Sequence, residues 1–281
     1  MICRAEGAAA LTLAVRDEYA SPLSEAMLLD WHSKLLNWEK RISVGAWRTH
    51  KEPMQVVSGP VGKEKVHFEA PPSTRVPAAM KDYIDWFNST APGEADAIDW
   101  PPVRSALAHL YFESIHPFED GNGRIGRAIS EKALCQGLGG PITMSLSTVI
   151  EANRKSYYEE LNAAQSERDV SGWVSYFVGV CLEAQNHAET HIRFTVRKAR
   201  FFDQYKDQMN ERQIRAVNRM FEAGPDGLVG GMNARKYISI TKTSKATATR
   251  DLRGLQDLGV FRPEGGGRSV RYTLVLEDKP H

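Results

Sequence analysis

Twelve consecutive residues near the middle of the chain combine residue types that bind phosphate with one that accepts a proton. Residues 116–127 read His-Pro-Phe-Glu-Asp-Gly-Asn-Gly-Arg-Ile-Gly-Arg. Gly121 and Gly123 permit backbone conformations that let a ligand approach closely. We expect this loop to lead into a helix at about Gly126. The row of N–H groups at the N-terminus of such a helix would form a cradle for an anion.

Charged side chains surround this predicted cradle. Arg124 and Arg127 lie three residues apart and share a helix face, and two guanidinium groups on one face suit a polyphosphate. Asp120 offers a hard oxygen ligand for a Mg²⁺ ion that bridges phosphates. His116, at the end of the preceding helix, can accept a proton near neutral pH. A structural loop with a glycine turn and solvated arginines is the alternative, but it needs few of these residues.

Helical spacing of apolar residues predominates over residues 5–205, with one hairpin as the exception. Met54–Ser58 and Lys65–Glu69 are short β-type runs on either side of a Gly/Pro turn, which predicts a hairpin. We interpret the tryptophans as core residues. The expected helices lie at 5–38 with a break at Ser21-Pro22, near 80–87, from Pro101, and at about 126–138, 147–165 and 170–205.

A second unit is predicted after a boundary near residues 205–209. Its expected helices at 210–222, 232–239 and 244–258 precede two short strands around Gly265–Gly267, an order typical of a winged helix-turn-helix. Residues 209–281 contain 13 Lys and Arg against 8 Asp and Glu, while the whole chain carries a net charge of +1. This excess of positive charge is a mild indication of a polyanionic partner, and solvated surface charge explains it equally well.

Residues 116–127 resemble the signature of the Fic family, His-x-Phe-x-Asp/Glu-Gly-Asn-Gly-Arg-x-x-Arg, and every specified position is filled. Residues 54–72 are similar to the flap of that family, and residues 153–158 to its later helix, whose tyrosines face the adenine. The resemblance implies a mainly α fold. A Fic-type helical core with a β-hairpin flap would occupy residues 1–205, and a small C-terminal winged helix-turn-helix domain residues 209–281.

The activity implied by the resemblance is protein adenylyltransfer from ATP to a Ser, Thr or Tyr hydroxyl of a target protein or of the chain itself. His116 would be the catalytic base, and Asp120 would hold Mg²⁺ or Mn²⁺. The ATP-binding residues implied are Asp120, Gly121, Asn122, Gly123, Arg124, Arg127, Tyr157 and Tyr158, and the side chain of Asn122 would add a phosphate contact. Of the two adjacent tyrosines, at most one is expected to face the nucleotide. The flap residues implied to bind the target are Val56, Val57, Ser58 and Gly59.

Regulation is where the sequence departs from the family pattern. Many members carry an inhibitory helix, Ser/Thr-x-x-x-Glu-Gly/Asn, whose glutamate pairs with the arginine equivalent to Arg127. The nearest match is Ile2–Gly7, but Ile2 lacks the hydroxyl and the helix would have no room to begin. We therefore expect that Glu6 is not an inhibitor. An uninhibited enzyme, a separate inhibitory partner protein or a shortened chain remain as alternatives.

Two other functions and several partners stay open at this stage. The chain could be a DNA-binding regulator that uses the Fic core as a nucleotide sensor, or a de-AMPylating enzyme. A homodimer, and DNA bound by the tail, are further candidates. No apolar run approaches the roughly 20 residues of a membrane span, and three scattered cysteines give no disulfide framework. We expect a cytoplasmic protein without a membrane partner.

Overall fold

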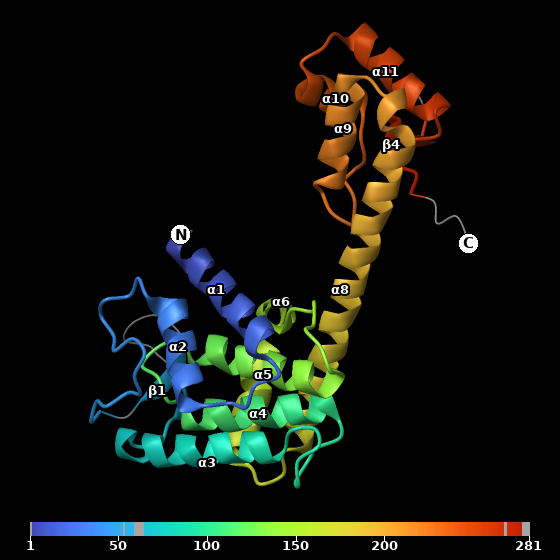
Figure 1. Ribbon diagram of the computed structural model, residues 1–281. Coiled ribbons are helices and arrows are strands. Elements are labelled where there is room, and N and C mark those ends of the chain that lie inside the picture. Colours follow the sequence, from blue (N-terminus) through green and yellow to red (C-terminus); the bar gives the residue numbers. More distant parts are fainter. Residues whose placement is uncertain (1, 53, 59–64, 267–268, 277–281) are drawn as a thin grey trace. The chain divides into compact units, whose positions relative to one another are not determined.

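The structure, a computed structural model, describes residues 2–52, 54–58, 65–266 and 269–276 (Figure 1). Two units divide the chain, residues 1–185 and 186–281. The division falls within one long helix, α8 (Ser171–Tyr205), some residues before the boundary that we predicted near 205–209.

Helices dominate the first unit, and the one sheet among its described residues is a two-stranded hairpin. Its elements are α1 (Ile2–Glu18), α2 (Glu25–Leu36), β1 (Gln55–Ser58), β2 (Lys65–Glu69), the 3₁₀ helix η1 (Ser73–Arg75), α3 (Val76–Ser89), α4 (Pro101–Ile115), α5 (Asn122–Leu138), α6 (Leu146–Ala152) and α7 (Arg154–Ser166). The mainly helical fold with a hairpin that we predicted is therefore confirmed.

Local sequence signals explain where these helices begin and end. The side chain of Ser24 caps α2 by accepting the N–H of Met27 at 3.2 Å, and Pro101 opens α4 at a position where a missing N–H costs nothing. The single helix expected over 147–165 is wrong. Asn153 leaves the helical conformation (φ −124°, ψ 35°) and separates α6 from α7, because its short side chain can bond to nearby backbone instead.

The pair α4 and α5 forms the centre of this unit, and glycines let the two helices approach closely. A Cβ added at Gly126 would lie 2.5 Å from Oε1 of Glu113, and one at Gly137 would lie 2.5 Å from the side chain of Pro101. The buried core around them includes Trp31, Tyr83, Phe87, Phe112, Phe118, Ile125 and Ile129. Trp31 and Trp173 are buried as expected, but Trp100 is 74% exposed because it precedes the first turn of α4.

The first helix, α1, is tied to this core at both of its ends. Nζ of Lys132 donates to the carbonyl oxygens of Glu18 and Tyr19 at 2.6 and 3.0 Å, which satisfies the C-terminal end of α1. A Cβ at Gly7 would lie 2.5 Å from the carbonyl oxygen of Leu35. The expectation that no helix could begin here is therefore wrong, since α1 starts at Ile2.

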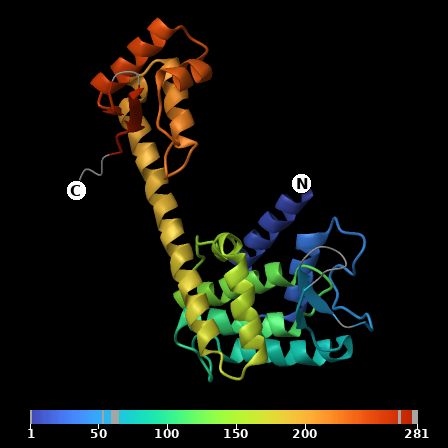
Figure 2. The ribbon, with the colours of Figure 1, turned by 180° about the vertical axis from the view of Figure 1, so that it is seen from behind.

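Within its described residues, the second unit contains the C-terminal part of α8, three further α-helices and a hairpin, seen from behind in Figure 2. Its elements after α8 are η2 (Lys206–Gln208), α9 (Glu211–Phe221), α10 (Ala234–Thr241), α11 (Lys245–Asp257), β3 (Phe261–Glu264) and β4 (Arg271–Leu274). Asp251 is buried at its centre, where it accepts hydrogen bonds from Nε of Arg212 at 2.8 Å and from the hydroxyl of Tyr237 at 3.1 Å. The helix expected at 232–239 begins later, because Asn233 serves as its N-cap.

Candidate active site

A cavity of about 400 Å³ lies at the N-terminus of α5, between the loop that follows α4 and the helices α6 and α7. His116 and all eight residues that we predicted to bind ATP line this cavity. They come from the α4–α5 loop, from the first two turns of α5 and from α7. The fold thus brings together residues that lie up to 42 positions apart in the chain, from His116 to Tyr158.

The helix that carries the cradle begins earlier than we predicted. Gly121 is the N-cap of α5, with a φ of 89° that favours glycine, and the helix starts at Asn122 rather than near Gly126. The first regular helical bond runs from the N–H of Ile125 to the carbonyl of Gly121 at 3.0 Å. The N–H groups of Asn122 and Gly123 therefore lie in the first turn of the helix, where N–H groups have no acceptor within the helix and can bind anions.

Asn122 and Phe118 close the loop in front of this helix. The side chain of Asn122 accepts from the N–H of Phe118 at 2.9 Å and donates to its carbonyl at 2.8 Å. Both polar groups of this side chain thus bond to the backbone of the loop, and the phosphate contact that we expected from it stays a prediction. Phe118 is fully buried and stacks on the ring of His32 with centroids 4.0 Å apart, so it anchors the loop against the core.

His32 also fixes the backbone beside Asp120. Its Nδ1 accepts from the N–H of Gly45 at 2.9 Å, so its Nε2–H donates to the carbonyl oxygen of Asp120 at 3.1 Å. Burial lowers the pKa of His32, so the neutral ring required for this arrangement is the stable form near pH 7. Nothing in the sequence motif pointed to His32.

His116 caps the end of α4 in the left-handed conformation, with φ 51° and ψ 60°. Arg48 holds that conformation: its Nε donates to the carbonyl of His116 at 2.8 Å, and its N–H donates to the carbonyl of Pro117 at 2.9 Å. Burial, together with the charge of Arg48, lowers the pKa of His116 to about 4. The imidazole is therefore neutral near pH 7, as a general base must be.

The charged residues of the motif lie where phosphates would enter the cavity. Nη2 of Arg124 donates to Oδ1 of Asp120 at 3.1 Å, and the side chains are 35% and 57% exposed. Nε of Arg127 donates to the hydroxyl of Ser147 at 2.9 Å. Both guanidinium groups come from α5 and line the same cavity, so a polyphosphate at the helix end would meet two positive charges.

The two adjacent tyrosines of α7 differ in their surroundings. Tyr157 is 3% exposed, and its hydroxyl is 2.8 Å from Nε2 of His109. Burial lowers the pKa of His109 to about 3, so this histidine stays neutral and shares a hydrogen bond with the tyrosine hydroxyl. Tyr158 is only partly buried. Tyr157 thus belongs to the core, although it also lines the cavity. Its burial agrees with the expectation that at most one of the two tyrosines faces the nucleotide.

The hairpin near this cavity has the antiparallel pairing expected of a flap. Gln55 pairs with Glu69 and Ser58 with Lys65, with an irregularity in register between Val56 and Val57. Gln55 lines the cavity together with Met54. Gly59, the last of the four predicted flap residues, lies outside the described residues.

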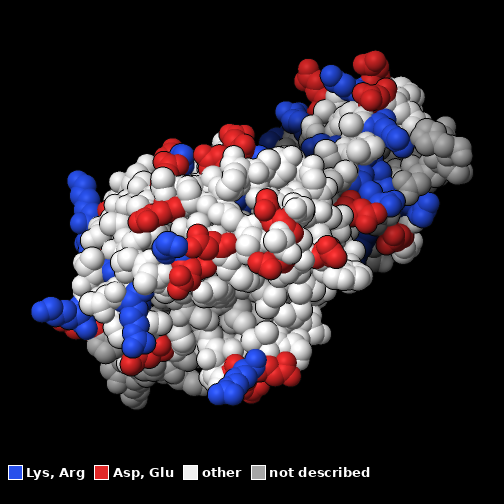
Figure 3. Space-filling view, turned by 60° about the horizontal axis from the view of Figure 1, so that its bottom comes forward, with Lys and Arg blue, Asp and Glu red and all other residues white. Residues whose placement is uncertain are grey.

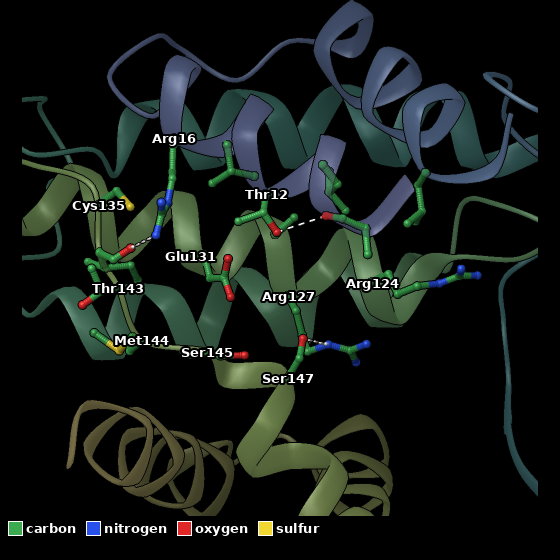
Figure 4. Close-up of a pocket in the computed structure, with 16 residues that line it drawn as sticks. Thr12, Arg16, Arg124, Arg127, Glu131, Cys135, Thr143, Met144, Ser145 and Ser147 are labelled. Atoms are coloured by element: carbon green, nitrogen blue, oxygen red, sulfur yellow. Dashed lines mark hydrogen bonds between the residues drawn. The ribbon is translucent and has the colours of Figure 1, made fainter. Parts of the chain in front are cut away.

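A second cavity, of about 330 Å³, lies on the other side of Arg124 and Arg127 (Figure 4). Thr12 and Arg16 of α1 face it from one side, and Glu131 of α5 lies opposite. Burial raises the pKa of Glu131 to about 7. The helix α1 therefore borders the space next to both motif arginines.

A family model described as Fic/DOC family matches residues 22–134, a range that contains the whole of residues 116–127. The chain carries a Fic/DOC domain. This Fic domain extends from just before α2 to within α5. Tyr157, Tyr158 and the C-terminal unit lie beyond the matched range.

Curated relatives of the Fic domain are named as adenylyltransferases. Protein adenylyltransferase fic-1 of Caenorhabditis elegans is 29% identical over 140 residues, which are 49% of this chain and 23% of that protein. A probable protein adenylyltransferase of Aquifex aeolicus is 31% identical over 98 residues, 35% of this chain and 27% of that protein. The chain thus spans about a quarter of the length of each.

Solved structures support the same fold. A Fic family protein from Desulfovibrio desulfuricans aligns with 98% of this chain and 75% of its own, with a TM-score of 0.52 and 24% identity. Fic-1 from C. elegans aligns with 65% of this chain and 49% of its own, with a TM-score of 0.50 and 24% identity.

Three residues near the motif escaped the sequence-based prediction: His32, Arg48 and Glu113. Arg48 and His32 act through backbone groups of the loop and lie 68 and 84 positions before His116, so spacing could not indicate them. Glu113 lies one helical turn before His116, and its i, i+3 spacing on one helix was a signal that could have found it.

Proposed function

We propose that the chain is a protein adenylyltransferase that moves AMP from ATP to a hydroxyl of a target protein or of itself. One observation carries the proposal. A neutral, buried imidazole at His116 shares a cavity with a helix N-terminus and two motif arginines. The names of the curated relatives support the same activity.

The chemistry follows from what these groups can do. His116 would take the proton of the target Ser, Thr or Tyr hydroxyl, and the oxygen would then attack the α-phosphate. A new phosphorus–oxygen bond forms, the α–β bond breaks and pyrophosphate leaves. The N–H groups of Asn122 and Gly123 would hold the phosphates, and Arg124 and Arg127 would stabilise the β- and γ-phosphate charge. Catalysis would come mostly from positioning and charge stabilisation.

Asp120 fits a site for Mg²⁺ or Mn²⁺. Its side chain is 57% exposed, lines the cavity, and lies beside the proposed phosphate cradle. Mg²⁺ takes one or two carboxylates and completes its shell with phosphate oxygens and water. Within the described residues no three His, Cys, Asp or Glu side chains cluster, so the donor set fits a metal held mainly by the nucleotide. When bound, the ion would supply charge neutralisation on the phosphates.

The hairpin would hold the target segment. In the antiparallel pair β1–β2, the edge of β1 that does not face β2 would bind an extended peptide by main-chain hydrogen bonds. The proximity of Gln55 to the cavity supports this role, because a peptide paired with β1 would pass close to His116.

Transfer of label from ATP carrying ³²P at the α-phosphate tests the proposal. The purified chain, incubated with Mg²⁺ and cell lysate, should label itself or a lysate protein, whereas ATP labelled at the γ-phosphate should leave no label. His116→Ala should lower transfer by about 10²–10⁴ and leave ATP affinity within about threefold. If the parent chain binds ATP but transfers nothing, while it releases AMP from a pre-labelled protein, the activity is de-AMPylation instead.

We further propose that the second unit is a winged helix-turn-helix. A short turn that includes Lys242 separates α10 from α11, and the hairpin β3–β4 follows. On the surface of α11, Lys245, Arg250 and Arg253 are exposed. On the face shown in Figure 3, however, basic side chains lie among acidic ones. Binding to duplex DNA should weaken steeply with salt if this unit contacts phosphates, and the absence of any binding at low salt would leave dimerisation or targeting as its role.

The described helices include none that is both long and apolar enough to cross a membrane.

A further inference from the structure

Arg127 borders three cavities of the first unit. It lines the 400 Å³ cavity of the motif, the 330 Å³ cavity beside α1, and a small cavity of about 90 Å³ next to Glu113. A long arginine side chain beside so much open space has many rotamers to choose from, and holding one of them costs entropy. The direction in which the guanidinium points therefore depends on the groups that bind it.

A hydroxyl group of α6 holds this guanidinium. Nε of Arg127 donates to Oγ of Ser147 at 2.9 Å, and Figure 4 shows the two side chains joined beside the cavity. Ser147 lies in the first turn of α6, 20 positions after Arg127. The bond thus connects the helix of the motif to the helix that follows it.

The choice of a hydroxyl leaves the positive charge of Arg127 available. Two buried carboxyls, Glu113 and Glu131, are close enough to feel that charge, but among the described residues neither forms an ion pair with Arg127. An ion pair would offset the charge that a phosphate needs. Ser147 occupies Nε alone, so the four N–H groups on Nη1 and Nη2 remain for a ligand.

The bound side chain lies back along α5, towards the N-terminus of the helix. A Cβ added at Gly123 would lie 3.3 Å from Nη1 of Arg127. Gly123 belongs to the first turn of α5, and its N–H group is part of the proposed phosphate cradle. With Nε on Ser147, the guanidinium therefore has its Nη1 edge next to the cradle.

The position of Ser147 is itself fixed by contacts at the start of α6. The side chain of Ser145 caps this helix by accepting the N–H of Thr148 at 3.4 Å. The N–H of Leu146 bonds to the carboxyl of Glu131 on α5, and Leu146 is fully buried. The first turn of α6 is thus attached to the helix that carries Arg127, about one turn beyond that arginine.

We propose that Ser147 is the positioning residue for Arg127, and that its hydroxyl directs the guanidinium towards the third phosphate of a bound nucleoside triphosphate. This role rests on the proposed AMP transfer. Ser147 makes and breaks no covalent bond, and it acts through Arg127. The consequence is selectivity: a nucleoside diphosphate has no third phosphate, so the oriented guanidinium should favour ATP over ADP.

A purely structural role for this bond predicts a different result. Ser147 is exposed, and alanine is a better helix former than serine, so Ser147→Ala should keep the fold and the start of α6. If the bond served stability alone, its loss would change the affinity for ATP and for ADP to the same degree. Under the proposed role the affinity for the triphosphate should fall by itself.

The test measures binding of α,β-methylene ATP and α,β-methylene ADP by calorimetric titration in the presence of Mg²⁺. The methylene group replaces the bond that transfer would break, so both probes bind without reacting. The parent chain should prefer the triphosphate. Ser147→Ala should lower the affinity for the triphosphate about three- to tenfold, as the loss of one hydrogen bond predicts, and leave the affinity for the diphosphate within about twofold.

Three further proteins serve as controls. Thr148 is the next residue of α6, is also exposed, and donates its hydroxyl to Ser145 at 3.1 Å, so Thr148→Ala should keep the preference of the parent. Ser147→Thr retains a hydroxyl and should keep it as well. In Arg127→Met the preference should be lost, and adding Ser147→Ala should change nothing more, because the side chain that Ser147 orients is gone.

Several outcomes would overturn the proposal: an unchanged preference in Ser147→Ala, an equal loss of affinity for both probes, or a parent chain that binds both probes equally. The fate of the proposed function is separate. If ATP labelled at the α-phosphate yields no labelled protein but Ser147→Ala loses the preference, AMP transfer is wrong while the positioning role stands. If the parent transfers AMP and Ser147→Ala keeps the preference, the positioning role is wrong while AMP transfer stands.

Discussion

Replacing Arg48 by Met should destabilise the first unit and disturb His116 at the same time. The side chain of Arg48 is buried, with only 1% of the residue exposed. It donates to the carbonyls of His116 at 2.8 Å and Pro71 at 2.5 Å, and more weakly to Ile115 at 3.4 Å. Methionine keeps most of the apolar contact area of the stem but has no donor.

The size of the effect follows from these bonds. A hydrogen bond made by a charged donor contributes about 1.5–3 kcal/mol, and the abandoned carbonyls also lose solvation. Two strong bonds therefore predict a loss of about 3 kcal/mol or more. In a unit of about 185 residues, each kcal/mol corresponds to a change in Tm of about 2–4 °C. The Tm of the first unit should fall by about 6–12 °C.

Calorimetry of parent, Arg48→Met and Arg41→Met would measure this difference. Arg41 is the matched control, since its side chain is 86% exposed and pairs with Glu39 at 3.1 Å. Exposed pairs of this kind contribute about 0–1 kcal/mol, so Arg41→Met should change Tm by no more than about 4 °C. Equal Tm values for the two variants would refute the assignment of Arg48 as the residue that holds the backbone of His116.

Three further substitutions test other parts of the site. Gly126→Ala should lower transfer and stability together, by about 1–3 kcal/mol of unfolding free energy, because the new Cβ would overlap the Glu113 carboxyl; a Tm equal to that of the parent would argue against the close α4–α5 contact. Asp120→Ala should raise the Mg²⁺ concentration needed for transfer, whereas equal activity at every Mg²⁺ concentration would rule out Asp120 as the ligand. Glu6→Gly should leave self-labelling unchanged, because Glu6 is exposed and α1 contributes Ala8, Leu11, Thr12, Val15 and Arg16 to the cavity next to Arg124 and Arg127. An increase of about tenfold, or about 1.4 kcal/mol of barrier, would show that Glu6 is an inhibitor after all.

The periodicity of apolar residues was sufficient to predict the helical core, and the spacing of the motif was sufficient to predict which residues line the cavity at the N-terminus of α5. The glycines, arginines and histidine of residues 116–127 are contiguous, so a single loop and the start of one helix bring them together. An error arose where a short polar side chain competes with backbone bonds, since Asn153 divides a predicted helix in two.

Contacts between distant segments could not be read from the sequence in the same way. Arg48 and His32 donate hydrogen bonds to backbone carbonyl groups of the loop. Every residue type has a backbone carbonyl, so the residue types of the loop do not indicate these partners. Their roles depend on where the chain folds back, which periodicity does not reveal. The start of α1 was also misjudged, because its stability comes from Lys132 and from contact with α2 rather than from a capping residue.

The left-handed backbone of His116 has a consequence for how this chain can vary. A residue with a side chain pays about 1–2 kcal/mol for this conformation, and the proline that follows disfavours helical backbone angles as well. Glycine would adopt the same angles without that penalty. At this position the backbone conformation thus favours glycine, whereas the proposed reaction requires histidine. A library randomised at this position and selected only for a high Tm should enrich glycine, and the selected proteins should be more stable but inactive in AMP transfer. Selection for labelling should instead retain histidine, despite its strained backbone.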